Sequence, residues 1–278
     1  MRRVLAMTVA AVTALTLAAG CDSGNSGDSG GTADSGNSVA EGTAPTVPET
    51  PSASVPTASA EPSSPSAPPS AVPTSAPAAK PKKLKSGAKG AEVLALQNRL
   101  TELGYWMGKA DGKFGSTTQQ AVYALQKAAG IGRDGTVGVK TRKALDAGVR
   151  PKAKSTSGKM VEIDLKRQLL LLVDNGQVSQ VFNTSTGSME HYEQEGQTYL
   201  ADTPRGKFKV SRQIDGWRNA PLGMLWRPKY FNGGIAVHGA PSIPPYPASH
   251  GCARVSVAAM NWMWKNDALP IKTRVWVY

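Results

Sequence analysis

The feature that most restricts the fold is a low-complexity tract over residues 22–82. It consists mainly of Ser, Gly, Ala, Thr and Pro, and eleven prolines lie between Pro45 and Pro81. No apolar periodicity runs through it, so it cannot bury enough apolar surface to offset the conformational entropy lost on folding. We therefore expect a disordered linker over 21–82, with every folded domain lying C-terminal to it.

The residues before this tract predict an exported, lipid-anchored protein. Two arginines precede an apolar run over 4–19, which is shorter than the roughly 20 residues needed to span a bilayer. The sequence Leu-Ala-Ala-Gly-Cys at 17–21 resembles a bacterial lipobox. We expect a lipoprotein signal peptide over 1–20, lipidation of Cys21, and anchoring at the outer face of the cell membrane. Ordinary cleavage beside an incidental cysteine is the alternative.

Charge is divided unevenly along the chain. No Lys or Arg lies between Arg3 and Lys80, whereas the chain from Lys80 onward holds 30 basic and 14 acidic residues. A basic exported body suits an anionic partner, such as a bacterial cell wall with its acidic polymers. We do not expect nucleic acid as a partner, because export removes the opportunity and no basic helix or RNA-binding motif is present.

Residues 83–148 have the periodicity of helices. A first helix is indicated by apolar residues on one face and a glycine that stops it, namely Val93, Leu96, Leu100, Leu103 and Gly104. A second helix is expected from about residue 116 to Ala129, with Val122 and Leu125 facing inward.

An internal repeat lies in the same stretch. Each copy has a turn, an apolar plug, a second glycine and a helix start, the copies being Asp111-Gly112-x-Phe114-Gly115-x-x-Thr118 and Asp134-Gly135-x-Val137-Gly138-x-x-Thr141. We expect the glycines to adopt positive φ, so the motif residues mainly determine the fold. The whole stretch resembles the small three-helix peptidoglycan-binding module, which implies binding to wall glycan or stem peptide.

From Lys159 the pattern becomes that of strands. Val161, Ile163 and Leu165 alternate, and an apolar run over 169–173 is followed by the hairpin turn Asp174-Asn175-Gly176. Further strands are expected through Val210, before His238 and over 274–278, with one short helix over 257–265. These elements predict a mainly β domain over 158–278, large enough to bury its own core.

Histidine and cysteine are concentrated in one segment of this domain. Two of the three His and one of the two Cys lie in His238-Gly239 and Ser249-His250-Gly251-Cys252-Ala253-Arg254. If Cys21 carries lipid, Cys252 has no disulfide partner, and a free thiol near imidazoles can serve as a nucleophile with its base. An inert buried cysteine and a zinc site made by His238, His250 and Cys252 are the alternatives. Ser249 lacks the Gly-x-Ser-x-Gly surroundings of a serine nucleophile.

This segment resembles the signature of the L,D-transpeptidase (YkuD) catalytic domain. Supporting matches are Asp164-Leu165, Asn175-Gly176, Ser185-Thr186-Gly187 and Thr203-Pro204-x-Gly206-x-Phe208. The chain departs from the family at Ala253, where a branched aliphatic residue is more usual, and over 270–273, where a glycine is missing. The resemblance implies a YkuD-like β-sandwich with a short helix, preceded by a three-helix α module and a disordered linker.

The resemblance also implies a role for each residue of the segment. Cys252 would be the nucleophile and His238 its base, with the Gly239 carbonyl orienting the imidazole. Backbone N–H groups of Gly251 and Cys252 would form the oxyanion hole. His250 would shape the turn and the substrate channel, and Ser249 and Arg254 would bind substrate, although Arg254 could instead hold the following strand. No metal and no organic cofactor are expected.

The function predicted on these grounds is that of a cell-wall L,D-transpeptidase. It would form a Cys thioester with a peptidoglycan tetrapeptide stem and transfer the stem to an amine of a neighbouring stem. An L,D-carboxypeptidase or endopeptidase, in which water resolves the thioester, and a non-catalytic peptidoglycan-binding lipoprotein are the alternatives. His191 is expected at the surface without a role. Four aromatic residues either wall the cleft or belong to the core, namely Trp217, Trp226, Tyr230 and Phe231.

Overall fold

The computed structural model of this protein describes residues 82–278. The expected signal peptide over 1–20, the lipidation site Cys21 and all but the last residue of the expected linker lie outside the described residues. Between residues 82 and 278, no helix is both long and apolar enough to cross a membrane.

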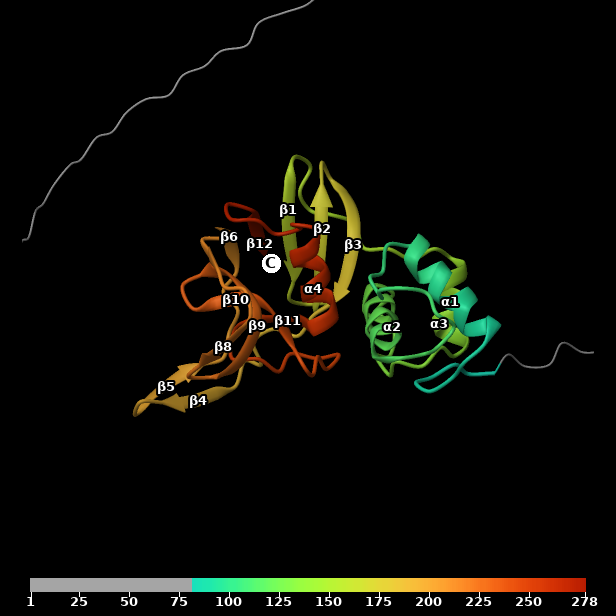
Figure 1. Cartoon of the computed structure of the whole chain (residues 1–278), viewed down its shortest axis with the longest axis horizontal. Coiled ribbons are helices and arrows are strands. Elements are labelled where there is room, and N and C mark those ends of the chain that lie inside the picture. The colour runs from blue at the N-terminus through green and yellow to red at the C-terminus, as the bar shows by residue number, and fades with distance from the viewer. Residues whose placement is uncertain (1–81) are drawn as a thin grey trace, which may run out of the picture. The chain divides into compact units, whose positions relative to one another are not determined.

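Three helices come first, and strands with one later helix follow (Figure 1). The helices are α1 (Ala91–Glu102), α2 (Ser116–Ala128), α3 (Val139–Asp146) and α4 (Val257–Lys265). The strands are β1 (Lys159–Asp164), β2 (Leu169–Asp174), β3 (Gln177–Asn183), β4 (His191–Gln194), β5 (Gln197–Leu200), β6 (Gly206–Lys209), β7 (Arg212–Gln213), β8 (Trp217–Ala220), β9 (Gly223–Asn232), β10 (Ile235–Ala240), β11 (Ala253–Ser256) and β12 (Arg274–Val277).

Helices α1–α3 form the helical module. Its repeat is held by two buried glutamines, each of which bonds the Asp of a turn and the Thr of the next helix, the sets being Gln97, Asp111 and Thr118, and Gln126, Asp134 and Thr141. Gly112 and Gly135 have φ of 69° and 68°, as predicted. The same prediction is wrong for Gly115 and Gly138, whose φ values are −91° and −92° because they are extended N-cap residues of α2 and α3.

The rest of the described chain is a β-sandwich, which confirms the predicted fold class. One sheet has the order β3-β2-β1-β12-β6, and the other has the order β11-β10-β9-β7 with β8 also paired to β9. Asn175 and Gly176 have φ of 47° and 78°, as the turn of the β2–β3 hairpin requires. Residues from both sheets and from α4, among them Ile163, Val237 and Met260, share the core between the sheets.

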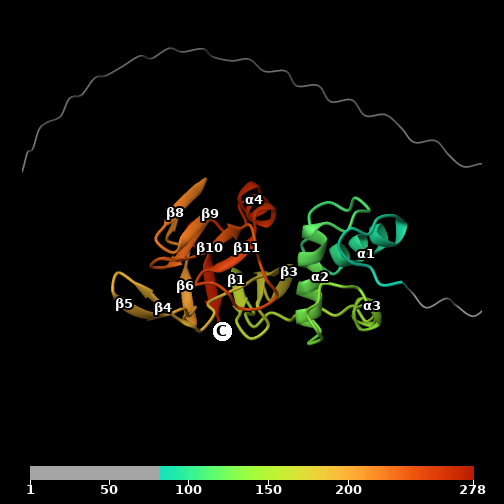
Figure 2. The same ribbon diagram turned by 90° about the horizontal axis from the view of Figure 1, so that it is seen from below.

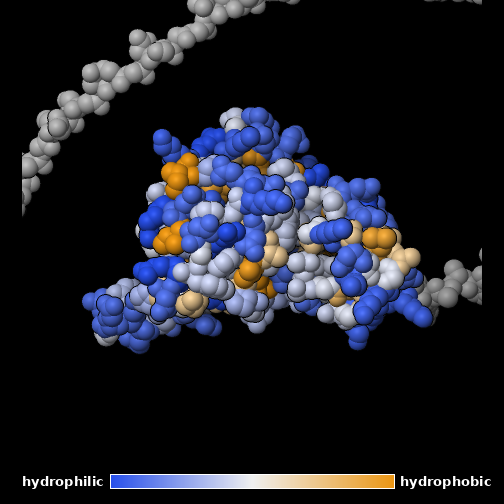
Figure 3. All heavy atoms as spheres, viewed as in Figure 1, coloured by the Kyte–Doolittle hydropathy of each residue, from blue (hydrophilic) through white to orange (hydrophobic). Residues whose placement is uncertain are grey.

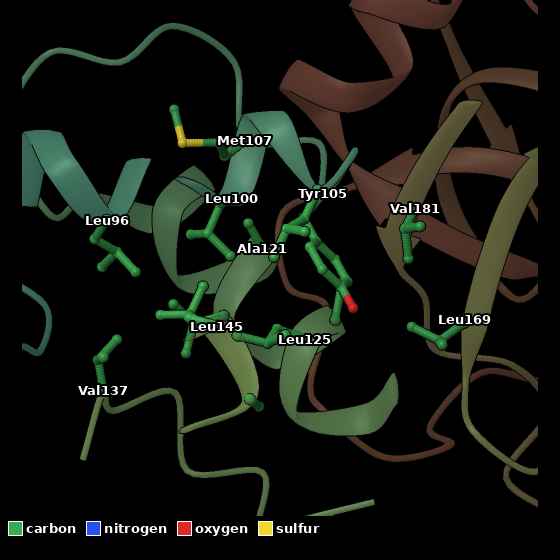
Figure 4. Packing of buried hydrophobic residues seen from close by; sticks show 14 of the residues in the cluster. Leu96, Leu100, Tyr105, Met107, Ala121, Leu125, Val137, Leu145, Leu169 and Val181 are labelled. Atoms are coloured by element: carbon green, nitrogen blue, oxygen red, sulfur yellow. The ribbon is translucent and has the colours of Figure 1, made fainter. Parts of the chain in front are cut away.

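The apolar run of β2 is buried on both faces. Leu170 and Leu172 point into the core between the sheets. Leu169, Leu171 and Val173 point to the opposite face, where they join the hydrophobic core of the helical module. Figure 4 shows strand residues Leu169 and Val181 beside Tyr105, with helical residues on the other side of the ring. A strand that is covered on both faces needs a continuous apolar sequence rather than an alternating one.

Polar contacts also join the helical module to the sandwich. The segment after α1 pairs with β3, since Trp106 N–H donates to the Val181 carbonyl at 3.0 Å. Lys127 of α2 donates from Nζ to the Gln168 and Thr184 carbonyls, both at 2.9 Å, and to Asn183 Oδ1. Burial lowers the pKa of Lys127 to about 6, while its three oxygen acceptors favour the ammonium form. Figures 1 and 2 both show α2 beside β3.

The apolar side chains are gathered mainly in these two cores. On the face drawn in Figure 3, hydrophilic residues cover most of the described surface, and hydrophobic residues form separate small patches. The strands that carry the predicted site residues are held in these cores by their buried faces. The cores therefore fix the positions of those residues.

Candidate active site

Strands β10 and β11 bring the predicted catalytic residues together. They pair in parallel, with Val237 opposite Ala253 and His238 opposite Arg254. Val237 and Ala253 point into the core between the sheets, so His238 and Arg254 point to the other face. Cys252 directly precedes Ala253, so its side chain points to the same face as those of His238 and Arg254. These three side chains line one cavity of about 770 Å³.

Cys252 is a free, partly buried cysteine. Its Sγ lies 3.4 Å from the Ala236 N–H, which donates to it, and 3.9 Å from the Gly234 carbonyl. Burial raises the pKa of the Cys252 thiol, and the Ala236 N–H and the Arg254 charge oppose this rise. The resting protein therefore holds a neutral thiol at neutral pH.

His238 is buried and held by its own strand. Its Nδ1 lies 3.0 Å from the Gly239 carbonyl, an acceptor, so Nδ1 carries the proton of the neutral ring and Nε2 has a free lone pair. Burial lowers the pKa of His238 to about 4; the hydrogen bond to the Gly239 carbonyl opposes the shift and the Arg254 charge adds to it. Among the residues described here, no hydrogen bond joins His238 to Cys252.

Gly239 is required by packing. A Cβ at this position would lie 2.8 Å from Trp226 Cδ1 and 3.1 Å from Met260 Cβ. Real Cβ atoms almost never approach a neighbour this closely, so a larger residue would push β10 away from β9 and α4. The absence of a side chain keeps the Gly239 carbonyl within reach of the His238 ring.

Ser249 closes the turn that presents the thiol. Its Oγ donates to the Cys252 carbonyl at 2.6 Å and accepts from the Gly251 N–H at 3.0 Å. The Gly251 N–H, predicted as an oxyanion donor, therefore already has an acceptor. Ser249 is only 2% exposed, and both bonds of its hydroxyl lie within the turn. Shaping this turn is a task that sequence reasoning did not assign to Ser249, and its contact with substrate stays a prediction.

Gly251 occupies the sharpest part of this turn. Its φ is 142°, and a Cβ would lie 2.7 Å from the Asp202 carbonyl oxygen. Thr203, next to Asp202, donates from Oγ1 to the Gly251 carbonyl at 2.6 Å and accepts from the Gly187 N–H at 2.9 Å. The motif residues Thr203 and Gly187 thus brace the turn that carries Cys252.

Arg254 is partly buried beside the thiol. It forms no salt bridge with any acidic residue of the described chain, and burial lowers its pKa. The backbones of Arg254 and Ser185 form two hydrogen bonds with each other. Arg254 N–H donates to the Ser185 carbonyl at 3.0 Å, and Ser185 N–H donates to the Arg254 carbonyl at 3.3 Å. The backbone of Arg254 is therefore fixed, and its guanidinium lines the cavity without an internal partner.

Two hairpins that sequence reasoning did not assign to the site also line the cavity. In the β4–β5 hairpin, Tyr192 stacks on Tyr199 at 5.6 Å between ring centroids and meets the exposed His250 ring edge-on at 4.8 Å. The β8–β9 hairpin contributes Arg218 and Met224. The only sequence signal for the first hairpin is its alternating polar and aromatic residues around a Glu-Gly turn, which does not indicate a cavity wall.

The remaining predictions about side chains divide between site and core. Tyr230 lines the cavity, Phe231 lies in the core, and Trp217 packs against Trp226 at 4.9 Å between ring centroids. His191 is exposed at the start of β4, as predicted. Within residues 82–278, no group of three His, Cys, Asp or Glu is placed to hold a metal ion.

Two family models match this chain, one over the β-sandwich and one over the helical module. Residues 158–277 match the model of the L,D-transpeptidase catalytic domain (YkuD), and residues 89–145 match that of a peptidoglycan binding domain. The fold and these matches define a protein with an L,D-transpeptidase catalytic domain C-terminal to a peptidoglycan-binding domain.

A solved structure covers both parts. The crystal structure of an L,D-transpeptidase from Xylanimonas cellulosilytica is 57% identical, with a TM-score of 0.70, over 73% of this chain and 100% of that chain. This chain belongs to the L,D-transpeptidase family.

Curated proteins resemble a smaller share of the chain. N-acetylmuramoyl-L-alanine amidase CwlL of Bacillus licheniformis is 48% identical over 85 residues, which is 30% of this chain and 24% of that protein. The spore cortex-lytic enzyme of Bacillus cereus is 40% identical over 62 residues, which is 22% of this chain and 24% of that protein. This chain spans about a quarter of the length of these curated relatives.

Proposed function

We propose that this protein is a cysteine-dependent cell-wall L,D-transpeptidase acting on peptidoglycan. Cys252 forms a thioester with a tetrapeptide stem, and an amine of a neighbouring stem resolves it. The observation that carries the proposal is the sharing of one cavity by a free thiol, Cys252, and a buried imidazole, His238, whose Nδ1 is committed to the Gly239 carbonyl. The family to which the chain belongs supports the choice of reaction.

The first half-reaction transfers the stem to the enzyme. Cys252 Sγ attacks the carbonyl of the third residue while His238 Nε2 takes the thiol proton. The C–N bond to the terminal D-amino acid breaks, the leaving nitrogen takes the proton from His238, and a C–S bond remains. Before substrate enters, the imidazole and the thiol are both uncharged, so the proton passes to His238 Nε2 as the C–S bond forms.

The second half-reaction releases the cross-linked product. The acceptor amine attacks the thioester carbonyl, and His238 takes a proton from that amine. The C–S bond breaks and Cys252 recovers its proton. The two stems are then joined through their third residues.

Stabilisation of the oxyanion falls to the backbone of the turn at 251–252. The Cys252 N–H is the primary donor in this proposal, because the Gly251 N–H donates to Ser249 Oγ in the resting protein. Rotation of the Ser249 side chain would free the second donor once substrate is bound. Such donors lower the barrier when they are already oriented toward the developing charge.

Arg254 is the proposed anchor for a carboxylate of the stem. Its guanidinium lines the cavity without a salt bridge inside the described chain. His250 and the β4–β5 hairpin would form a wall of the channel that receives the stem. In this proposal Arg254 performs two tasks, since its backbone holds the strand through Ser185 and its guanidinium binds substrate.

Cellular placement is part of the proposal. We infer a signal peptide over 1–20, lipidation at Cys21, a linker over 21–82, a peptidoglycan-binding module over 83–148 and a catalytic domain over 158–278. Incorporation of a labelled fatty acid into the wild-type chain but not into Cys21→Ala would support the anchor. Equal labelling of the two proteins would contradict it.

The outcome of the second half-reaction decides between transferase and hydrolase. The full chain is incubated with tetrapeptide stems, and the products are identified by mass spectrometry. Cross-linked dimers that disappear in Cys252→Ala are expected. Trimmed monomers without dimers would instead assign a carboxypeptidase, and no product at all would favour a wall-binding protein without activity.

A further inference from the structure

The outer face of the first sheet is divided into two halves. The helical module covers the half made by β2 and β3. The half made by β12 and β6 carries basic and aromatic residues, because Val275 and Phe208 point toward the core between the sheets and their neighbours point outward. Cross-strand pairing sets Trp276 opposite Lys207 and Arg274 opposite Lys209.

A second cavity lies over this outer face. It has a volume of about 600 Å³ and is lined by the segment 154–157, by β6 and by β12. We call it the basic groove, and its cationic residues are Lys154, Lys207, Lys209 and Arg274. It is separate from the cavity of Cys252, because the two share no lining residue.

The positive charge of the basic groove has no acidic counterpart. None of its four cations forms a salt bridge with another residue of the described chain. The nearby acid, Glu162, is fully buried, and its carboxylate accepts from the Lys154 and Ser155 backbone N–H groups at 2.9 and 2.7 Å and from the Tyr278 hydroxyl at 3.0 Å. The Glu162 carboxylate therefore holds the backbone of the segment 154–157 in place. It forms no salt bridge with any of the four cationic side chains of the groove.

Two of the ammonium groups are held over aromatic rings. Lys154 Nζ lies 3.8 Å from the centroid of the Tyr278 ring, and Lys207 Nζ lies 4.9 Å from a ring centroid of Trp276. Cation–π contacts of this kind restrict the side chains without neutralising their charge. The basic groove therefore presents ordered positive charge rather than freely moving lysines.

A buried hydroxyl in the same groove has no partner. Ser155 is 8% exposed, and its Oγ is the only buried side-chain oxygen or nitrogen in the described chain without a hydrogen bond. Leaving a buried hydroxyl unpaired is unfavourable, because the group loses its bonds to water without gaining others. Because Ser155 lines the groove, rotation of its side chain toward the groove would let a bound ligand supply the missing hydrogen bond.

We propose that the basic groove binds the phosphate groups of an anionic, phosphodiester-linked polymer of the cell wall. The single arginine of the groove already donates from Nη2 to the Ser157 carbonyl at 2.7 Å, so part of the fork with which Arg binds a carboxylate or a phosphate is engaged. Three lysines on two segments, 154–157 and β6, supply point charges of the kind that bind phosphate oxygens. The wall location rests on the proposed function, whereas the binding chemistry does not.

The test measures binding of inorganic polyphosphate to the full chain by isothermal titration calorimetry at low ionic strength. Lys207→Glu/Lys209→Glu is expected to weaken binding at least tenfold. The matched control, Lys140→Glu/Lys143→Glu, makes the same change of net charge on the exposed surface of α3 and is expected to weaken it less than threefold. Equal losses in the two variants would overturn the proposal, since attraction would then depend on net charge alone.

Two further arms sharpen the result. Ser155→Ala removes the unpaired hydroxyl without disturbing a hydrogen bond, so it is expected to weaken binding severalfold while the melting temperature is kept; unchanged affinity would remove Ser155 from the site. Polyglutamate of matched charge is expected to bind more weakly than polyphosphate, and equal or tighter binding would overturn the choice of phosphate. Lys209→Gln replaces the double variant if that variant melts early.

The readout is independent of the reaction proposed for Cys252. Acylation of Cys252 by a carbapenem is expected to proceed at the wild-type rate in Lys207→Glu/Lys209→Glu. Loss of polyphosphate binding with normal acylation supports the basic groove. Normal polyphosphate binding in that variant overturns the groove, whatever the result of the acylation assay.

Discussion

Gln120 of α2 and Asn183 of β3 donate from their side-chain amides to the same backbone oxygen, that of Ile243, each at 3.3 Å. Asn183 also donates to Gln120 Oε1 at 2.5 Å and accepts from Lys127 Nζ. Ile243 lies in the loop that leads into the turn at 249–252. The helical module thus contacts the loop that precedes the proposed nucleophile, and it does so through one small network of amides.

Gln120→Ala is expected to slow acylation of Cys252 about three- to tenfold, because one hydrogen bond to the loop contributes about 0.5–1.5 kcal/mol. The rate constant for carbapenem acylation measures this effect. Gln119→Ala is the control, since Gln119 is the adjacent residue of the same helix and its side chain forms no hydrogen bond with any residue of the described chain. Equal rates for Gln120→Ala and wild type would show that the network does not position the loop.

The shared core predicts that the helical module and the β-sandwich unfold together. Leu171 is 1% exposed and joins the core of the helical module from β2. Leu171→Ala is expected to lower the free energy of unfolding by about 2–5 kcal/mol. Leu94→Ala, at a site that is 40% exposed, should cost far less. Urea unfolding followed by fluorescence and by circular dichroism should give one transition, and two well-separated transitions would contradict the shared core.

The pH dependence of acylation follows from the two shifted groups of the site. Burial lowers the pKa of His238 to about 4 and raises the pKa of the Cys252 thiol, so both are neutral from about pH 5 to 8. The acylation rate constant should therefore fall only as pH drops toward 4, and it should be flat across neutral pH. A rate that climbs steadily from pH 6 to 9 would indicate that attack requires a thiolate formed beforehand.

The same shift of His238 makes stability depend on pH. The histidine is neutral in the folded protein, whereas in the unfolded chain it takes up a proton below pH 6.5. Stability should therefore fall as pH decreases from 6.5 to 4, by on the order of 3 kcal/mol from this group. Comparison of urea unfolding of wild type and His238→Gln over this range isolates the contribution, and parallel pH profiles would contradict it.

Thr203→Val tests the brace of the nucleophile turn. The substitution keeps the shape of the side chain but removes the hydroxyl that bonds the Gly251 carbonyl and the Gly187 N–H. Two buried backbone groups would lose their partner, so a loss of about 1–3 kcal/mol in unfolding free energy and slower acylation are expected. Thr203→Ser keeps the hydroxyl and should restore most of both quantities. A Thr203→Ser protein as impaired as Thr203→Val would contradict the brace, because serine keeps the hydroxyl that makes these two bonds.

Local patterns in the sequence predicted the elements that depend on neighbouring residues. The helix over 257–265 has the bounds of α4, and the Asn175-Gly176 turn forms the expected hairpin. The apolar run at 169–173 was predicted as a strand, but its two-sided burial depends on the helical module, which is distant in sequence. The periodicity of a sequence indicates how polar and apolar residues alternate along a segment. It does not indicate which distant element covers the second face of a strand.

In the candidate site, too, sequence patterns predicted local features but not contacts between distant segments. The motif around Cys252 predicted which side chains share the cavity, because the thiol and its neighbours are close in sequence. The Ser249 hydroxyl was predicted to face substrate, whereas its two bonds to the turn depend on backbone geometry that no residue pattern states. The β4–β5 hairpin could not be assigned either, since its contact with His250 joins residues about sixty positions apart in the sequence.

The most direct test of the account is the mass of the intact protein after incubation with a carbapenem. The account predicts one covalent adduct on wild type, located on the peptide that contains Cys252, much slower adduct formation in His238→Gln, and none in Cys252→Ala. Absence of an adduct on wild type, or the same adduct on Cys252→Ala, would contradict the claim that Cys252 is the nucleophile.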